Sequence, residues 1–232
     1  MNTAIIVAAG TGTRFKSEIP KQFVEIFGKP VIIHTLDRFD ACDLIDELVL
    51  VLASDAIDTF PAIAANRHFV KPIRLVTGGK TRAESVRNGL DAIGPNTEII
   101  AVHDGARPLV SVSEISQVIT KAAEVGAACL VAPITDTVKQ VEGGNIVGTV
   151  DRNKLRRALT PQAFRAGILR EAFEGIDLNE AITDECFLVE QTGREIAFIE
   201  GSPRNIKITN PDDIVLAKMY LEMEEQGSKC TA

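Results

Sequence analysis

The chain has 232 residues, of which 45% are hydrophobic and 25% are charged, and its formal net charge is −7 at pH 7. This length allows one substantial α/β domain without requiring two, and the composition excludes a disordered or fibrous protein. The negative net charge disfavours nonspecific binding to nucleic acid or to an anionic membrane, so an anionic ligand needs a local cluster of cations.

No segment of the sequence is typical of secretion or of membrane insertion. Residues 1–7 lack a basic region followed by a long apolar stretch, and no run of 18 apolar residues occurs. We therefore expect a cytoplasmic protein that acts without a membrane or a nucleic acid. The four cysteines include no Cys-x-x-Cys pair, so the sequence predicts neither a zinc site nor a disulfide framework.

Short apolar runs alternate with helical patterns through the first part of the chain. Continuous apolar runs are typical of strands that are covered on both faces. We predict such strands at residues 4–8, 48–52, 73–76, 99–103 and 128–132. Helical patterns lie at residues 31–39, 55–66, 81–92 and 113–125, with Ser113 as the expected N-cap of the last. The alternation predicts an α/β fold with a mostly parallel, doubly wound sheet.

The pattern changes to a β-hairpin after residue 133. Residues 137–141 and 146–150 are strand-like and flank a Glu-Gly-Gly-Asn sequence that suits a tight turn. A lone hairpin is marginally stable in water, so this arm, at about residues 134–152, needs a surface to pack on.

The rest of the chain continues the same domain, which we expect to span residues 1–232 without a linker. We predict a helix near residues 164–174, strands at 195–200 and 205–208, and a helix at about 211–225. Asn210 as a cap and Pro211 in the first turn are typical of a helix start.

A glycine-rich segment directly follows the first predicted strand. Gly10 and Gly12 allow the backbone to approach a phosphate chain and to direct its N–H groups at the oxygens. Neither the dinucleotide fingerprint, which has a glycine in place of Phe15, nor the P-loop is present. The cations come later, at Arg14 and Lys21. This spacing suits a triphosphate whose α-phosphorus is attacked, although a tight turn with solvated basic residues is the alternative.

Asp104 follows the fourth predicted strand. The carboxyl ends of strands border the ligand crevice in open α/β sheets, so Asp104 is placed to hold a hard cation. A magnesium ion between Asp104 and triphosphate oxygens would neutralise the leaving pyrophosphate. The alternative is that Asp104 only caps the turn that follows.

A second glycine pair, Gly78 and Gly79, follows the third predicted strand and precedes a helix. Such a pair lets backbone groups contact the edge of a base, and Arg82 and Ser85 lie one helical turn apart on the same face. The alternative is a turn that binds no ligand.

The whole chain resembles the family of 2-C-methyl-D-erythritol 4-phosphate cytidylyltransferases. Eight segments occur in the order typical of that family, at residues 8–15, 20–22, 78–85, 103–108, 149–153, 159–162, 183–185 and 205–209. The resemblance implies a Rossmann-like nucleotidyltransferase fold, CTP and a polyol phosphate as substrates, Mg²⁺ as cofactor, and a homodimer that acts in non-mevalonate isoprenoid synthesis.

The resemblance also implies roles for individual residues. The catalytic cations are Arg14, Lys21 and Lys207, and the magnesium ligand is Asp104. The nucleotide-binding positions are Ala8, Ala9, Gly10, Gly12, Gly79, Arg82, Ser85, Asp104, Gly105 and Arg107. Among them, Ala8, Ala9, Gly79 and Ser85 resemble the positions that contact cytosine. The positions around the polyol phosphate are Thr137, Arg152, Thr160 and Thr183. We expect the arm to cross to a second subunit, so that Arg152 contacts the phosphate in the partner's site.

The expected chemistry needs no catalytic triad. A phosphate monoester carries a charge of about −1.5 to −2 at pH 7, so the nucleophile is already ionised. The enzyme has to orient two anions and stabilise the transition state electrostatically.

Two other functions remain as alternatives. A ribitol 5-phosphate cytidylyltransferase shares the fold and the cations, but residues 149–153 favour the methylerythritol substrate. A noncatalytic nucleotide sensor could keep the fold, but Lys21 and Asp104 are both present.

Overall fold

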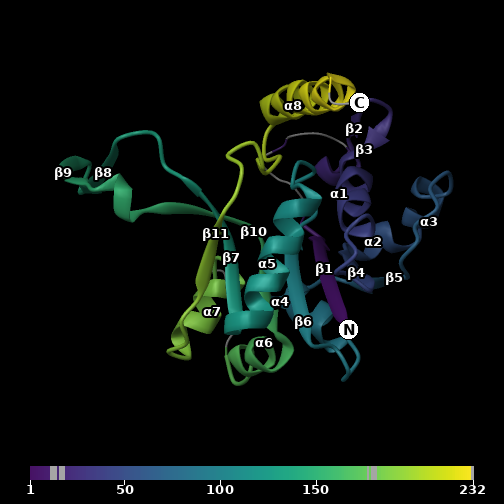
Figure 1. Cartoon of the computed structure of the whole chain (residues 1–232), viewed down its shortest axis with the longest axis horizontal. Helices are drawn as coiled ribbons and strands as arrows, with labels where there is room; N and C mark the ends of the chain where they lie inside the picture. Colours follow the sequence, from purple (N-terminus) through teal and green to yellow (C-terminus); the bar gives the residue numbers. More distant parts are fainter. Residues whose placement is uncertain (11–14, 16–18, 177, 179–181, 231–232) are drawn as a thin grey trace.

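The computed structural model of the chain describes residues 1–10, 15, 19–176, 178 and 182–230 (Figure 1). Their main feature is a seven-stranded sheet in the order β11-β7-β10-β6-β1-β4-β5. The strands are β1 (Asn2–Ala8), β4 (Glu47–Leu52), β5 (Ile73–Thr77), β6 (Ile99–Asp104), β7 (Ala127–Pro133), β10 (Arg156–Arg165) and β11 (Ala197–Glu200). Only β10 runs antiparallel to its neighbours in this sheet. The predicted α/β class and mostly parallel sheet are confirmed.

Helices cover both faces of the sheet. One face packs against α1 (Val31–Asp40), α2 (Ser54–Ile57), α3 (Phe60–Ile63) and α5 (Val112–Val125). The other packs against α4 (Arg82–Asp91), α6 (Ala166–Ala172) and α7 (Glu185–Gln191). In β1, Ile6 faces the first core and Ile5 the second, as the two-residue period of a strand requires. Burial on both faces explains why the central strands are continuous apolar runs.

A third apolar cluster lies beyond the carboxyl ends of the strands. Ile214, Ala217 and Leu221 share one face of α8 (Pro211–Cys230) and pack with Ile26 of β2 (Glu25–Ile26). β2 pairs with β3 (Lys29–Pro30) in a two-stranded sheet. Figure 1 shows α8 at the top, beside β2 and β3. None of the helices in the described part of the chain is long and apolar enough to cross a membrane.

The predicted hairpin arm is confirmed as β8 (Val138–Glu142) paired with β9 (Asn145–Val150). Gly143 and Gly144 form its turn with φ angles of 54° and 82°, a conformation that favours glycine at both positions. The arm extends away from the sheet in Figure 1 and leads into the 3₁₀ helix η3 (Arg152–Lys154).

Three helix predictions need correction. Residues 55–66 form two short helices, α2 and α3, and Pro61 lies in the first turn of the second. The N-cap of α5 is Ser111 rather than Ser113, because Ser111 Oγ accepts the backbone N–H of Glu114 at 3.1 Å in a capping box. The helix predicted at 164–174 begins at Ala166, since the preceding residues belong to β10.

One strand of the main sheet was not predicted, and one predicted strand was wrong. The strand that was not predicted is β10, which lies between β7 and β6 in the sheet. Proline is rare inside central strands, and Pro161 lies where the pairing of β10 with β7 is interrupted between Ala158 and Gln162. Residues 205–208 form an extended connection without strand pairing, and this connection crosses the end of the sheet next to Asp104.

Candidate active site

A cavity of about 1030 Å³ lies at the carboxyl ends of the parallel strands. This is the edge at which open α/β sheets bind ligands, because the loops that follow neighbouring strands converge there. The cavity is lined by segments that follow β1, β4 and β5, by the end of β6 and by the connection before α8. Nine residues predicted from the sequence line it: Ala8, Ala9, Gly10, Lys21, Gly79, Arg82, Ser85, Asp104 and Lys207.

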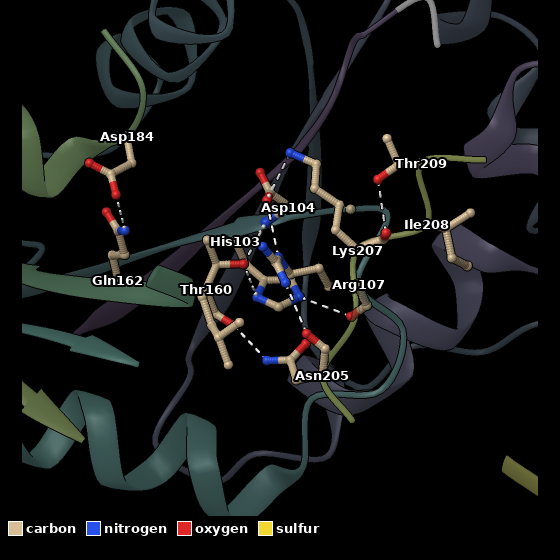
Figure 2. Close-up of polar contacts among 12 residues, drawn as sticks. His103, Asp104, Arg107, Thr160, Gln162, Asp184, Asn205, Lys207, Ile208 and Thr209 are labelled. Carbon is tan, nitrogen blue, oxygen red and sulfur yellow. Dashed lines mark hydrogen bonds and ion pairs between the residues drawn. The ribbon is translucent and has the colours of Figure 1, made fainter. Parts of the chain in front are cut away.

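Asp104 is the centre of a charged cluster in this cavity (Figure 2). Its Oδ1 accepts from Arg82 Nε at 3.1 Å, and its Oδ2 lies 3.2 Å from Arg107 Nε and 3.0 Å from Lys207 Nζ. Burial alone would raise the pKa of Asp104, but the charges of Arg82, Lys207 and Arg107 hold it well below its usual range. Asp104 therefore remains a carboxylate at neutral pH.

Glu185 is a second carboxylate in the cluster, and its role was not predicted. It is fully buried at the start of α7, and its Oε1 and Oε2 accept from Arg82 Nη1 at 2.6 Å and Nη2 at 3.0 Å. Burial opposes the charge of Arg82, but Glu185 and Asp104 outweigh this effect and raise the pKa of Arg82. A bidentate ion pair of this kind fixes the orientation of the guanidinium. The arrangement holds Arg82 against Asp104.

The cluster carries an excess of positive charge. The cations Arg82, Arg107 and Lys207 face the two carboxylates Asp104 and Glu185. Lys21 adds a further cation to the cavity lining. A protein of net charge −7 therefore has a local site that attracts anions, as the sequence led us to expect.

Lys21 belongs to a segment that is tied to the end of β1. It begins the 3₁₀ helix η2 (Lys21–Phe23), and its Nζ donates to the carbonyl oxygen of Ile208 at 2.9 Å. The next residue, Gln22, donates from Nε2 to the carbonyl oxygen of Ala8 at 2.9 Å. Lys21 and Lys207 thus reach the cavity from opposite ends of the chain. The predicted residues Gly12 and Arg14 lie outside the described residues.

The two glycine-containing loops lie against each other. A Cβ atom on residue 78 would lie 2.2 Å from Ala9 Cβ, so this close approach requires Gly78. The backbone N–H of Gly79 donates to Ser85 Oγ at 3.1 Å, and Ser85 Oγ donates to the carbonyl oxygen of Thr81 at 2.9 Å. Ala8, Ala9, Gly79 and Ser85, whose side chains are small or absent, line this part of the cavity, which suits the flat edge of a base.

A buried hydrogen-bond chain supports Asp104 from below (Figure 2). The backbone N–H of Asp104 donates to Thr160 Oγ1 at 3.1 Å, and this hydroxyl lies 3.0 Å from His103 Nδ1. His103 Nε2 lies 3.1 Å from the carbonyl oxygen of Arg107, a group that can only accept. His103 therefore donates from Nε2 and accepts at Nδ1, and burial lowers its pKa to about 3.

Asn205 joins this chain to the connection before α8. Its Nδ2 donates to the backbone carbonyl oxygen of Thr160 at 2.9 Å, and its backbone carbonyl oxygen accepts from Arg107 Nη1 at 2.9 Å. The hydrogen bonds fix β6, β10 and the Lys207 segment relative to one another.

Several predicted residues lie outside the lining of the large cavity. Thr160 is buried beneath Asp104, and Gly105 donates its N–H to the carbonyl oxygen of Val7 at 2.8 Å. Thr183 is exposed in the loop before α7. Thr137 and Arg152 are exposed on the arm, where Arg152 Nη1 donates to the carbonyl oxygen of Thr135.

The neutral state of His103 predicts a pH dependence of stability. Its folded pKa of about 3 lies below the unfolded value, so the unfolded chain binds the extra proton and stability falls as the pH drops below about 6.5. For one such group, the expected fall in unfolding free energy between pH 6.5 and 4.5 is about 2 kcal/mol. His103→Gln should remove most of this slope in urea unfolding.

The control for this measurement is His68→Gln, because His68 is exposed. Replacing it removes a histidine without changing the buried chain. An equal pH slope in the wild type and in His103→Gln would show that His103 is not the titrating group.

Comparisons with known proteins identify the family. The sequence model of 2-C-methyl-D-erythritol 4-phosphate cytidylyltransferase (IspD) matches residues 2–223. The enzyme of that name from Bacillus licheniformis is 41% identical over 229 residues, which are 98% of this chain and 99% of that protein. The one from Syntrophus aciditrophicus is 42% identical over 225 residues, 96% of each chain.

Solved structures agree with the sequence comparison. The 4-diphosphocytidyl-2C-methyl-D-erythritol synthase from Anaerococcus prevotii superposes with a TM-score of 0.83 at 31% identity, over 95% of this chain and 98% of that one. The 2-C-methyl-D-erythritol 4-phosphate cytidylyltransferase from Thermus thermophilus gives a TM-score of 0.74 at 30% identity, over 94% and 98%. The chain belongs to the family of 2-C-methyl-D-erythritol 4-phosphate cytidylyltransferases.

Proposed function

We propose that this protein transfers CMP from CTP to 2-C-methyl-D-erythritol 4-phosphate, giving 4-CDP-2-C-methyl-D-erythritol and pyrophosphate for isoprenoid precursor synthesis. The observation that carries the proposal is the cation cluster around Asp104 in a large cavity at the carboxyl ends of the strands. Family membership supports the choice of both substrates. Because CTP is an intracellular metabolite, the proposal includes a cytoplasmic location.

CTP is proposed to occupy the large cavity, whose volume of about 1030 Å³ is sufficient for a nucleotide. The cytosine is proposed to lie against Ala8, Ala9, Gly79 and Ser85, which line the cavity with small side chains or none. The triphosphate then extends past Gly10 toward Lys21. Gly12 and Arg14 are proposed to contact the same phosphates, as their places in the family motif imply.

The proposed reaction is an attack of a phosphate oxygen of the polyol phosphate on the α-phosphorus of CTP. A bond forms between these two atoms, and the bond from the α-phosphorus to pyrophosphate breaks. The nucleophile is already ionised, so no residue needs to remove a proton. Preplaced cations are most effective where negative charge develops, and Lys21 and Lys207 supply them. His103 is buried and neutral, which suits a supporting role.

The side chains of the charged cluster do not form a magnesium site by themselves, so a magnesium ion is proposed to bind there together with the nucleotide. A carboxylate oxygen is a preferred ligand of Mg²⁺, but both oxygens of Asp104 contact cations. No group of three or more metal-ligating side chains occurs among the described residues. We propose that Asp104 and triphosphate oxygens together hold Mg²⁺, which supplies positive charge to the leaving pyrophosphate.

Asp104→Asn should raise the magnesium concentration needed for the half-maximal rate by about tenfold, an effect of roughly 1.4 kcal/mol. The amide keeps an oxygen ligand but loses the charge that a hard cation prefers. The control is Asp91→Asn, which makes the same charge change at an exposed position on α4. Superimposable magnesium titrations for Asp104→Asn and the wild type would assign Asp104 a structural role only.

The second substrate is proposed to bind between two subunits of a homodimer. Thr160, Thr183 and Lys207 would come from one subunit, and Thr137 and Arg152 from the arm of its partner. Exposure of Thr137 and Arg152 supports this arrangement, because both side chains are accessible to another subunit. Each subunit is then a single nucleotidyltransferase domain of residues 1–232 that contributes an arm, about residues 134–152, to its partner.

The proposed function is tested by assaying the purified protein with CTP, Mg²⁺ and one polyol phosphate at a time. Pyrophosphate release with 2-C-methyl-D-erythritol 4-phosphate, but not with ribitol 5-phosphate, is the expected result. A preference for ribitol 5-phosphate would instead identify that substrate. Tight CTP binding without pyrophosphate release with either acceptor would indicate a nucleotide sensor.

A further inference from the structure

A second cavity of about 370 Å³ adjoins the large one. Lys207 and Thr209 line both cavities, so the connection before α8 forms the wall between them. The smaller cavity is also bordered by Arg107, Arg157 and Asp213. Its position next to the proposed transfer site makes its charge relevant to the substrates.

The lining of this smaller cavity is strongly cationic. Arg107, Arg157 and Lys207 face one acidic side chain, Asp213. Asp213 Oδ2 already accepts the backbone N–H groups of Thr209 at 2.7 Å and of the next residue at 2.9 Å. The negative charge of Asp213 is thus partly engaged by donors that are not the cations. The cavity suits a small anion with more than one negative charge.

Among the residues that the structure describes, Arg157 differs from the other two cations because its guanidinium has no partner. Arg107 and Lys207 both contact Asp104, at 3.2 and 3.0 Å. In the described part of the chain, the Arg157 guanidinium has neither a hydrogen bond nor an ion pair. A guanidinium in this state can form two parallel hydrogen bonds with a phosphate.

We propose that Arg157, which borders the smaller cavity, is a specificity-determining residue for the phosphate group of the acceptor polyol phosphate. This inference rests on the proposed function, to which it adds a residue that the family motifs do not contain. Lys207 borders both cavities, so it can contact the acceptor phosphate and the triphosphate at the same time. The acceptor phosphate is then held at the wall that separates it from the nucleotide.

The inference is tested with Arg157→Gln and a matched control, Arg156→Gln. Arg156 is the neighbouring residue of β10, and its replacement makes the same charge change. Its guanidinium contacts the carbonyl oxygens of Asn153 and Leu155 and the ring of Phe198, and it does not line the cavity. A loss of phosphate affinity that occurs in Arg157→Gln but not in Arg156→Gln therefore reflects the cavity rather than the general electrostatic field of the protein.

Two measurements are made on the full-length protein. The first is the dissociation constant for inorganic phosphate, by phosphorus NMR with CTP filling the large cavity. The second is the steady-state KM for 2-C-methyl-D-erythritol 4-phosphate. Arg157→Gln should raise the dissociation constant for phosphate and the KM for the polyol phosphate about tenfold each, the effect of losing a charged hydrogen bond. The kcat and the KM for CTP should change less than twofold. Arg157→Lys should recover part of the loss, because it restores charge without the planar donors.

The outcomes separate this inference from the proposed function. Phosphate affinity that is unchanged in Arg157→Gln, or equally reduced in Arg156→Gln, overturns the inference even if the enzyme is active. Dissociation of a dimer by Arg157→Gln with unchanged phosphate affinity also overturns it, since Arg157 would then belong to an interface. Phosphate binding that depends on Arg157, in a protein inactive with the polyol phosphate, supports the anion site and contradicts the proposed acceptor.

Discussion

Lys21→Ala is expected to lower kcat by about 10²–10³-fold, with a much smaller increase in the KM for CTP. Removal of one preorganised group that stabilises the transition state typically has this effect. Lys21 lines the large cavity, and its Nζ is anchored at 2.9 Å on the carbonyl oxygen of Ile208, next to Lys207. An anchored cation does not have to reorganise when negative charge moves during the transfer, so its loss affects the transition state more than the bound substrate.

The control for Lys21→Ala is Lys29→Ala, which removes the same charge from β3. Lys29 Nζ pairs with Asp37 at 2.9 Å and lies outside the cavity lining. Both variants are first compared in thermal unfolding, because Lys21 also bonds to the backbone. A kcat within threefold of the wild type in a folded Lys21→Ala protein would exclude the proposed catalytic role.

The sheet could be predicted from the sequence where each strand is a continuous apolar run covered on both faces. β1, β4, β6 and β7 are of this kind, and their positions were correct to within a residue or two. β10 was missed because its signal is mixed. It begins with two arginines and contains Pro161, yet its residues 159–164 are buried between two neighbours. Only the tertiary structure supplies the partners that make such a segment a strand.

The cavity could also be predicted in large part, because its residues follow strands in the sequence. The loops after parallel strands meet at one edge, so Gly10, Gly79 and Asp104 were expected to be close together. The partners of these residues could not be predicted. Arg82 and Glu185 are 103 residues apart, and no local pattern connects them.

Local hydrogen bonds are a different case, because a sequence can indicate them. Thr81 and Glu84 have the spacing of a capping box, and the structure contains that box at the start of α4. The same spacing in Ser111 and Glu114 would have corrected the N-cap predicted for α5. Short-range capping could therefore be predicted from the sequence, whereas the hydrogen bond from the backbone N–H of Asp104 to Thr160 could not.

The proposed exchange of arms between subunits predicts a large recovery of activity in mixed dimers. Val141, Ile146 and Val147 on the arm are 66%, 67% and 51% exposed, so the hairpin presents apolar surface that its own subunit leaves uncovered. A two-stranded hairpin is marginally stable alone, which favours packing against a second subunit. If the arm crosses, Arg152 serves the partner's site while Lys21 serves its own.

Mixing inactive Lys21→Ala and inactive Arg152→Ala proteins should then restore activity to about a quarter of the wild type. With equal amounts and random pairing, half of the dimers are mixed, and the two-fold symmetry leaves one of their two sites intact. The other site of each mixed dimer carries both substitutions. If Arg152 acts in its own subunit instead, every site carries one defect and activity stays at background. Mass spectrometry of the mixture confirms that subunits have exchanged, and background activity despite complete exchange would contradict the crossed arrangement.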